Sequence, residues 1–218
     1  MKKFVIVDTE YTRAGRVYDF AAIVCDAQGV EYESMHCLIA ETLQDVSAMC
    51  TSYYNNKMPL YLAQLANAQV QITTWNDCRT QFITMCDNWG VDIAYAYNES
   101  ADRTKCDKMT NGDFMPAPFA WVDLAELTRR TICTRASFIL FAIKNGLVSE
   151  KTSNVSCSAD TVLKYLRGMD YQEEHTALSD CRDELAIFLA CHTMRNNCNG
   201  RQEVNSEQAI IELILQSL

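Results

Sequence analysis

Five residues, far apart in the chain, carry the chemistry that this sequence could perform. Asp8 and Glu10 close an apolar run, Asp102 follows another, and His175 and Asp180 open a late helical pattern. Carboxylate oxygens are the ligands that hard divalent cations prefer, and two such ions held together promote phosphodiester hydrolysis. An imidazole, which titrates near pH ~6.5, suits removal of a proton from the attacking water. The residue types therefore predict a two-cation hydrolytic site, provided that the fold brings them together.

The hydrophobic pattern predicts elements that could do so. β-rich runs at 4–7, 17–25 and 30–39 are separated by short turns, which indicates an antiparallel meander. Helical spacing follows at 76–89, with further strands at 91–97 and 119–124, and the last helices are expected at 136–145, 159–166 and 177–194. We therefore expect an α/β fold, with a mixed five-stranded sheet (antiparallel meander, then parallel strands) flanked by helices. Ligands gather at strand ends in such sheets.

Composition restricts the class of protein. The chain has 218 residues, of which 49% are hydrophobic, so a sizeable core is expected, and we predict a single domain over 1–200. The eleven cysteines form no Cys-x-x-Cys pair, which argues against structural zinc and favours buried thiols. No apolar run is long enough to cross a membrane. A cytoplasmic protein without a membrane partner is the expectation.

The net charge of −9 argues against tight non-specific duplex binding, but not against an enzyme that holds one strand end. Basic residues follow Asp102 directly, beginning at Arg103, and could approach phosphates; solvated helix charges are an equal alternative. The segment 201–218 is expected to form a C-terminal amphipathic helix. It would pack on the same domain, with a polymerase or a second copy of the chain as the less favoured partner.

At these motifs the chain resembles the DEDDh family of 3′–5′ exonucleases. Phe4-Val5-Ile6-Val7-Asp8-Thr9-Glu10 is similar to the family's first motif, and Asn98…Asp102 is similar to the second. His175-Thr176-Ala177-Leu178-Ser179-Asp180 is a close match to the third, whose histidine precedes its aspartate by five. The resemblance spans roughly residues 3–194. The family includes the proofreading exonuclease subunit of bacterial replicative polymerase and oligoribonuclease-like RNases.

This resemblance implies a ribonuclease H-like fold and hydrolysis from the 3′ end of single-stranded DNA or RNA. It implies two Mg²⁺ or Mn²⁺ ions per active site, held by Asp8, Glu10, Asp102 and Asp180, with His175 as general base. The expected substrate contacts come from residues within or beside the motifs: Thr9, Tyr11, Asn98 and Arg103. The chain departs from the family where Tyr11-Thr12-Arg13 replaces the usual Thr-Thr-Gly, and where Asp19 stands for a glutamate.

Two other functions remain open at this stage. A non-catalytic module on the same fold would bind a nucleic-acid end or a protein without cleaving it. An oligoribonuclease-like enzyme would process short RNA rather than trim DNA. All five proposed site residues are present, which ranks catalysis first.

Overall fold

The computed structural model describes residues 2–50, 52, 55–112, 114–115, 118–148 and 154–200. The predicted C-terminal helix at 201–218, and with it the proposed polymerase or self-association contact, lies outside these residues. The described chain divides into two compact units, and the single domain over 1–200 stays a prediction. The first unit holds Met1–Ala125 and Glu173–Ala186, and the second holds Glu126–Gln172 and continues from Ile187.

The first unit is built on a mixed sheet of six strands in the order β4-β3-β2-β1-β5-β6. β1, β2 and β3 pair antiparallel, whereas β5 pairs parallel with β1, and β6 pairs parallel with β5. The strand bounds are β1 Lys3–Tyr11, β2 Val17–Asp26, β3 Glu31–Ile39, β4 Gln71–Thr73, β5 Ile93–Ala96 and β6 Ala120–Asp123. The predicted α/β class, with a meander followed by parallel strands, is confirmed.

Two details of the predicted sheet are wrong. The sheet has six strands rather than five, because β4 adds to its edge beside β3. β4 is only three residues long, too short to show strand alternation in the sequence. The first strand also does not stop at Val7: β1 continues through Asp8 and Glu10 to Tyr11, so both acidic residues lie within the strand.

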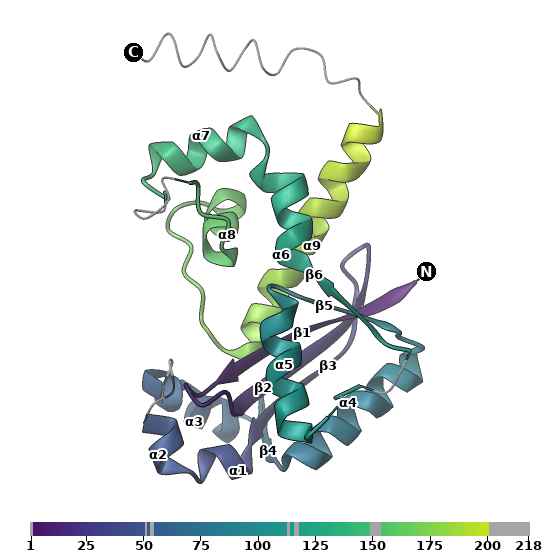
Figure 1. The fold of residues 1–218 in the computed structure, drawn as a ribbon, viewed down its shortest axis with the longest axis vertical. Helices are drawn as coiled ribbons and strands as arrows, with labels where there is room; N and C mark the ends of the chain where they lie inside the picture. The colour runs from purple at the N-terminus through teal and green to yellow at the C-terminus, as the bar shows by residue number, and fades with distance from the viewer. Residues whose placement is uncertain are drawn as a thin grey trace. The chain divides into compact units, whose positions relative to one another are not determined.

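Helices α4 (Trp75–Trp89) and α5 (Glu99–Thr110) lie on one face of the sheet and share a core with it (Figure 1). Val5 and Val7 of β1 belong to that core, together with Phe82 of α4. The side chain of Thr74 caps α4 by accepting the N–H of Asp77, and Gly90 ends the helix in the left-handed conformation. Because alternate strand residues face opposite ways, Ile6, Asp8 and Glu10 are directed away from this core.

The beginning of α9 (Ala177–Gly200) covers the opposite face. Cys181 of this helix is fully buried, and its thiol donates to the carbonyls of Ile6 and Ala21 on β1 and β2. The other helices of the first unit are short, and they follow β3 in the chain. They are α1 (Ala40–Leu43), α2 (Val46–Cys50), the 3₁₀ helix Asn55–Lys57 and α3 (Met58–Ala66).

The second unit contains helices, beginning with the end of α6 (Leu124–Thr128) and a π-helical turn at Arg129–Cys133. They continue through α7 (Ala136–Lys144), α8 (Ala159–Arg167) and the later part of α9. The ring of Tyr165 packs edge-on against Phe138 and Phe141, at centroid distances of 5.3 and 5.4 Å. The cysteines whose side chains are described are free thiols, most of them buried, as expected. In the described part of the chain, no helix is long and apolar enough to span a membrane.

Candidate functional site

Strand alternation places Asp8 and Glu10 side by side on the α9 face of β1. Asp8 pairs across the strands with Ala21 and Glu10 with Asp19, and the register shifts after Glu10. Glu10 is only 7% exposed and Asp8 is half-buried, with its Oδ2 atom buried. The two carboxylates therefore enter the space between the sheet and the start of α9.

Asp102 reaches the same strand from α5. The carboxylate is 5% exposed, and its Oδ1 accepts the backbone N–H of Thr9 at 3.1 Å and the Thr9 hydroxyl at 2.7 Å. Thr9 stands between Asp8 and Glu10, so these two bonds fix Asp102 against the strand. The side chain of Thr9 is 4% exposed and its hydroxyl donates to Asp102, and contact of Thr9 with nucleic acid stays a prediction.

Replacing Thr9 by Val should test this positioning role, since Val keeps the shape but removes the hydroxyl donor. We expect a loss of roughly 1–3 kcal/mol in the free energy of unfolding, the usual effect of removing a hydrogen bond to a buried charged group. Denaturant unfolding measures it. Thr9→Ser, which keeps the donor, should retain more of the stability, and equal losses in both variants would argue against the role.

His175 and Asp180 come from the start of α9. Asp180 lies in the first turn, where its N–H donates to the Thr176 carbonyl at 2.9 Å. His175 precedes the helix with a left-handed φ of 57°, which is uncommon for a residue other than glycine. Its side chain is 30% exposed, and its Nδ1 lies 3.6 Å from Oε2 of Glu173. The histidine is thus partly open to solvent at the edge of the acidic residues.

Three of the five predicted residues meet closely. One ligand atom each from Glu10, His175 and Asp180 can be chosen so that all lie within 4.8 Å of one another. Asp8 and Asp102 interact with this group through their charges. The charges of Asp180 and Glu10 act on Asp8, and the charge of Asp102 acts on Glu10. The structure therefore brings Glu10, His175 and Asp180 together in the first unit, and Asp8 and Asp102 lie near enough to interact with this group through their charges.

The carboxylates of this site repel one another in a buried environment. Burial, then repulsion from Asp180, raises the pKa of Glu10 to about 10. Burial also raises the pKa of Asp180 to about 8, with Glu173 adding to the shift, and that of Asp102 to about 7 against the lowering effect of its bonds to Thr9. The pKa of Asp8 is raised well above its usual value by burial and by Asp102. Such a site favours bound positive charge.

These shifts predict how stability depends on pH. With the pKa values raised, the folded protein keeps protons that the unfolded chain releases near pH ~4, so the cation-free protein should lose stability as the pH rises from there toward about 10. Cations need the deprotonated ligands. The gap between the Tm in Mg²⁺ and the Tm in EDTA should therefore widen from pH 5 to pH 9. A constant or narrowing gap would contradict the site.

Three further acidic residues act on the site: Glu173 and Glu184, which the sequence did not single out, and Asp19, which it noted only as a departure from the family's glutamate. Glu173 lies beside His175, and Glu184 lies one turn after Asp180 on α9, 4% exposed. Asp19 is fully buried on β2 and accepts three bonds, from His36 Nε2 at 2.9 Å, the Tyr61 hydroxyl at 2.7 Å and the N–H of Ala177 at 3.0 Å. Asp19 thus anchors the first residue of α9. The spacing of Asp180 and Glu184 by four residues was the available signal for Glu184.

The remaining predicted substrate contacts lie around α5. The ring of Tyr11 is partly exposed and stands 4.8 Å from the Lys105 ammonium, and burial together with Asp102 raises its pKa. Asn98 is exposed at the start of α5 with a left-handed φ of 67°. Arg103 is exposed, and its Nε lies 3.5 Å from Oε2 of Glu99. Contact of these three residues with nucleic acid stays a prediction.

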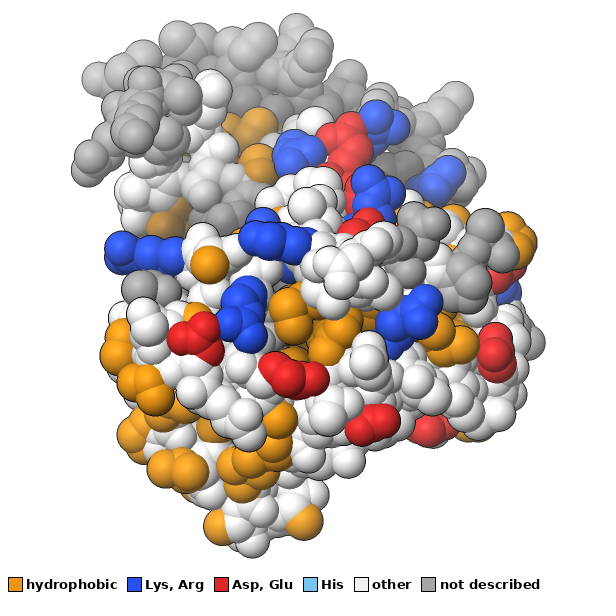
Figure 2. Space-filling view, turned by 60° about the horizontal axis from the view of Figure 1, so that its bottom comes forward, with side chains coloured by type: hydrophobic (Ala, Val, Ile, Leu, Met, Phe, Trp, Pro, Cys, Tyr) orange, Lys and Arg blue, Asp and Glu red, His pale blue; other side chains and the backbone are white. Residues whose placement is uncertain are grey.

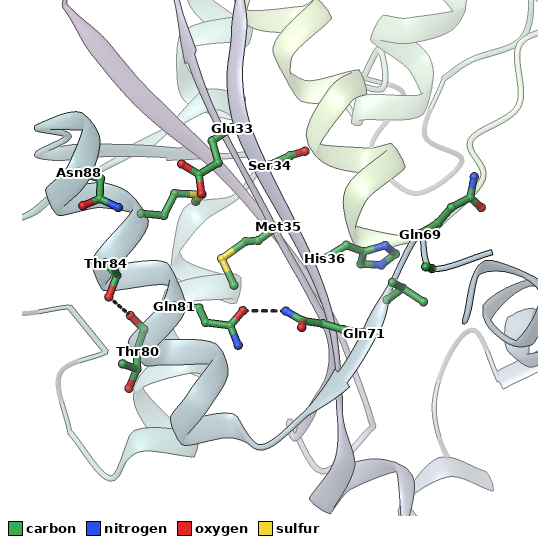
Figure 3. A pocket seen from close by; sticks show the side chains of 13 residues that line it. Glu33, Ser34, Met35, His36, Gln69, Gln71, Thr80, Gln81, Thr84 and Asn88 are labelled. Carbon is green, nitrogen blue, oxygen red and sulfur yellow. Dashed lines mark hydrogen bonds between the residues drawn. The ribbon is translucent and has the colours of Figure 1, made fainter. Parts of the chain in front are cut away.

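The surface charges and the hollow described next lie apart from the acidic residues of the site. On the face in Figure 2, basic and acidic side chains are interspersed rather than gathered into one large patch of a single sign. A hollow of about 560 Å³ is lined by residues of β3, β4 and α4 and the segment before β4, none of them a site carboxylate. Across it, Gln71 Nε2 donates to Gln81 Oε1 at 2.7 Å (Figure 3).

None of the protein-family models matches the chain, and the curated proteins include no significant match to it.

Proposed function

We propose that this protein is a metal-dependent 3′–5′ exonuclease of the DEDDh type on a ribonuclease H-like fold. The observation that carries the proposal is the convergence of Glu10, His175 and Asp180 within 4.8 Å, with Asp8 and Asp102 in the same field. The antiparallel β1–β3 followed by parallel β5 and β6, as the hydrophobic pattern predicted, is compatible with the fold of the proposal. Its substrate is the 3′ end of single-stranded DNA or RNA.

The residues fit Mg²⁺ or Mn²⁺. All four carboxylates offer hard oxygen ligands, and the buried Oδ2 of Asp8 has no hydrogen-bond partner among the described residues. Asp8 would be shared by both ions, Glu10 and Asp180 would hold one of them, and Asp102 would assist the other. When bound, the two cations supply activation of a water molecule and stabilisation of charge on the leaving oxygen.

The protein's own residues position this chemistry and move the proton. His175 takes a proton from the attacking water, for which its partial exposure beside Glu10 and Asp180 is suitable. Thr9 and Asp19 position other residues of the site. Thr9 donates a hydrogen bond to Asp102, and Asp19 accepts the N–H of Ala177 at the start of α9. The product is a nucleoside 5′-monophosphate and a strand shorter by one residue.

The test is an assay on 5′-labelled single-stranded DNA and RNA of equal sequence, each in Mg²⁺, Mn²⁺ or EDTA. We expect stepwise shortening with either cation, none in EDTA, and release of 5′-mononucleotides. A circular strand, which has no 3′ end, is the control and should persist. Binding of the oligonucleotide without shortening under any condition would replace the enzyme by the non-catalytic module, and shortening of RNA alone would favour the RNA-processing enzyme.

A further inference from the structure

Glu184 joins two of the elements that carry the site. It lies four residues after Asp180, so both side chains emerge from the same side of α9. Its Oε1 accepts the backbone N–H of Tyr97 at 3.0 Å. Tyr97 directly follows β5 and precedes the helix that carries Asp102. Through this bond Glu184 connects the helix of Asp180 to the turn before the helix of Asp102.

The second oxygen of Glu184 is unusual. Oε2 is buried and has no hydrogen-bond partner among the described residues, and the same holds for Oδ2 of Asp8. Leaving a buried carboxylate oxygen unpaired is costly. The charged groups that act most on Glu184 are Asp102, Asp180 and Glu173, all negative. The side chain is 4% exposed, so it places an acceptor without a partner among acidic residues, where a cation would be stabilised.

We propose that Glu184 is a fifth carboxylate of the cation site, whose Oε2 accepts a hydrogen bond from a water bound to the second divalent cation. The inference rests on the proposed function, because it assigns the site two cations. Contact through water is assigned because the other oxygen of Glu184, Oε1, is already bonded to the backbone N–H of Tyr97. Mg²⁺ usually keeps several of its water ligands, and these are donors that need an acceptor. Glu184 is thus a positioning residue, not a catalytic one.

Glu184→Gln isolates the charged oxygen, because the amide oxygen of Gln can still accept the N–H of Tyr97. Mn²⁺ titration followed by electron paramagnetic resonance counts the bound ions without measuring hydrolysis. We expect two ions in the wild type, and in the variant a second ion bound about 10–100-fold more weakly, the usual effect of losing an outer partner of a metal site. The Mg²⁺ concentration for half-maximal hydrolysis should rise in parallel.

Asp183→Asn is the matched control, since Asp183 is a neighbouring buried carboxylate of the same helix, 7% exposed. Its Mn²⁺ titration should shift less than that of the Glu184 variant, although the charge of Asp183 also acts on Asp180. If Glu184→Gln fails to fold by circular dichroism, Glu184→Asp can replace it, because it keeps the charge on a shorter side chain. In Glu184→Asp the second Mn²⁺ ion should also bind more weakly than in the wild type, but by a smaller factor. Unchanged binding of the second ion in the folded Glu184 variant overturns this inference alone. A wild type that binds no Mn²⁺ and shortens no oligonucleotide overturns the proposed function as well.

Discussion

Asp8→Asn is expected to abolish hydrolysis and at the same time to raise the thermal stability of the cation-free protein. Asp8 would be shared by both cations, so its loss removes several kcal/mol of charge stabilisation. Since each ~1.4 kcal/mol is a factor of ten in rate, the turnover should fall by at least about a thousandfold. Single-turnover shortening of a 5′-labelled oligonucleotide in excess Mg²⁺ measures this fall.

The gain in stability follows from the raised pKa of Asp8. In the cation-free protein, burial and four neighbouring carboxylates disfavour its ionised form, with Asp102 the largest of these charges. An amide of the same shape removes that repulsion, so the Tm in EDTA at pH 8 should rise, by roughly 2–4 °C for each kcal/mol gained. In Mg²⁺ the order should reverse, because the variant loses the cation's stabilisation.

Asp26→Asn gives a control of opposite sign on the neighbouring strand. The carboxylate of Asp26 accepts the Tyr32 hydroxyl at 2.7 Å and the N–H groups of Gln28 and Val30, and these bonds lower its pKa. Its replacement should therefore lower the Tm in EDTA and leave the turnover of the folded protein unchanged. If Asp8→Asn also lowered the Tm in EDTA, the carboxylates would not repel one another as the structure indicates.

The sequence predicted those parts of the site whose residues lie close together in the chain. Asp8 and Glu10 stand two apart in a β-rich run, so strand alternation alone places them on one face. His175 and Asp180 lie at the start of the long helix predicted over 177–194, and a helix start could be read from the sequence. The meander and the parallel strands after it were predicted, whereas the pairing of β5 with β1 was not.

The unpredicted part depends on packing between distant elements. Whether the carboxylate of Glu184 faces solvent or the site is decided by which side of α9 rests on β1 and β2, and the contacts of Cys181 with both strands reveal that side. The pairing of Asp19 with Glu10 required the strand register. The division into two units had no signal either, because α9 runs through both and few Gly or Pro residues mark a boundary.

His175→Ala carries the second large expected effect, and it separates two roles that the structure allows for the imidazole. His175 lies within 4.8 Å of ligand atoms of Glu10 and Asp180, so it could be a cation ligand as well as a base. Its Nδ1 also lies 3.6 Å from Glu173 Oε2. A carboxylate on one ring nitrogen leaves the other to accept a proton. The same arrangement is typical of a histidine that binds a cation, so the variant decides between the two roles.

As a general base, His175 should contribute about 10²–10⁴ in turnover. The Ala variant should lose that factor in kcat, with little change in KM or in Mn²⁺ binding, and added imidazole should restore part of the rate. His192→Ala, which removes an exposed histidine stacked on Phe188 later in α9, should behave like the wild type. Loss of Mn²⁺ binding in His175→Ala would instead make the imidazole a ligand, and near-normal turnover would remove it from the reaction, because a base that takes the proton cannot be dispensable.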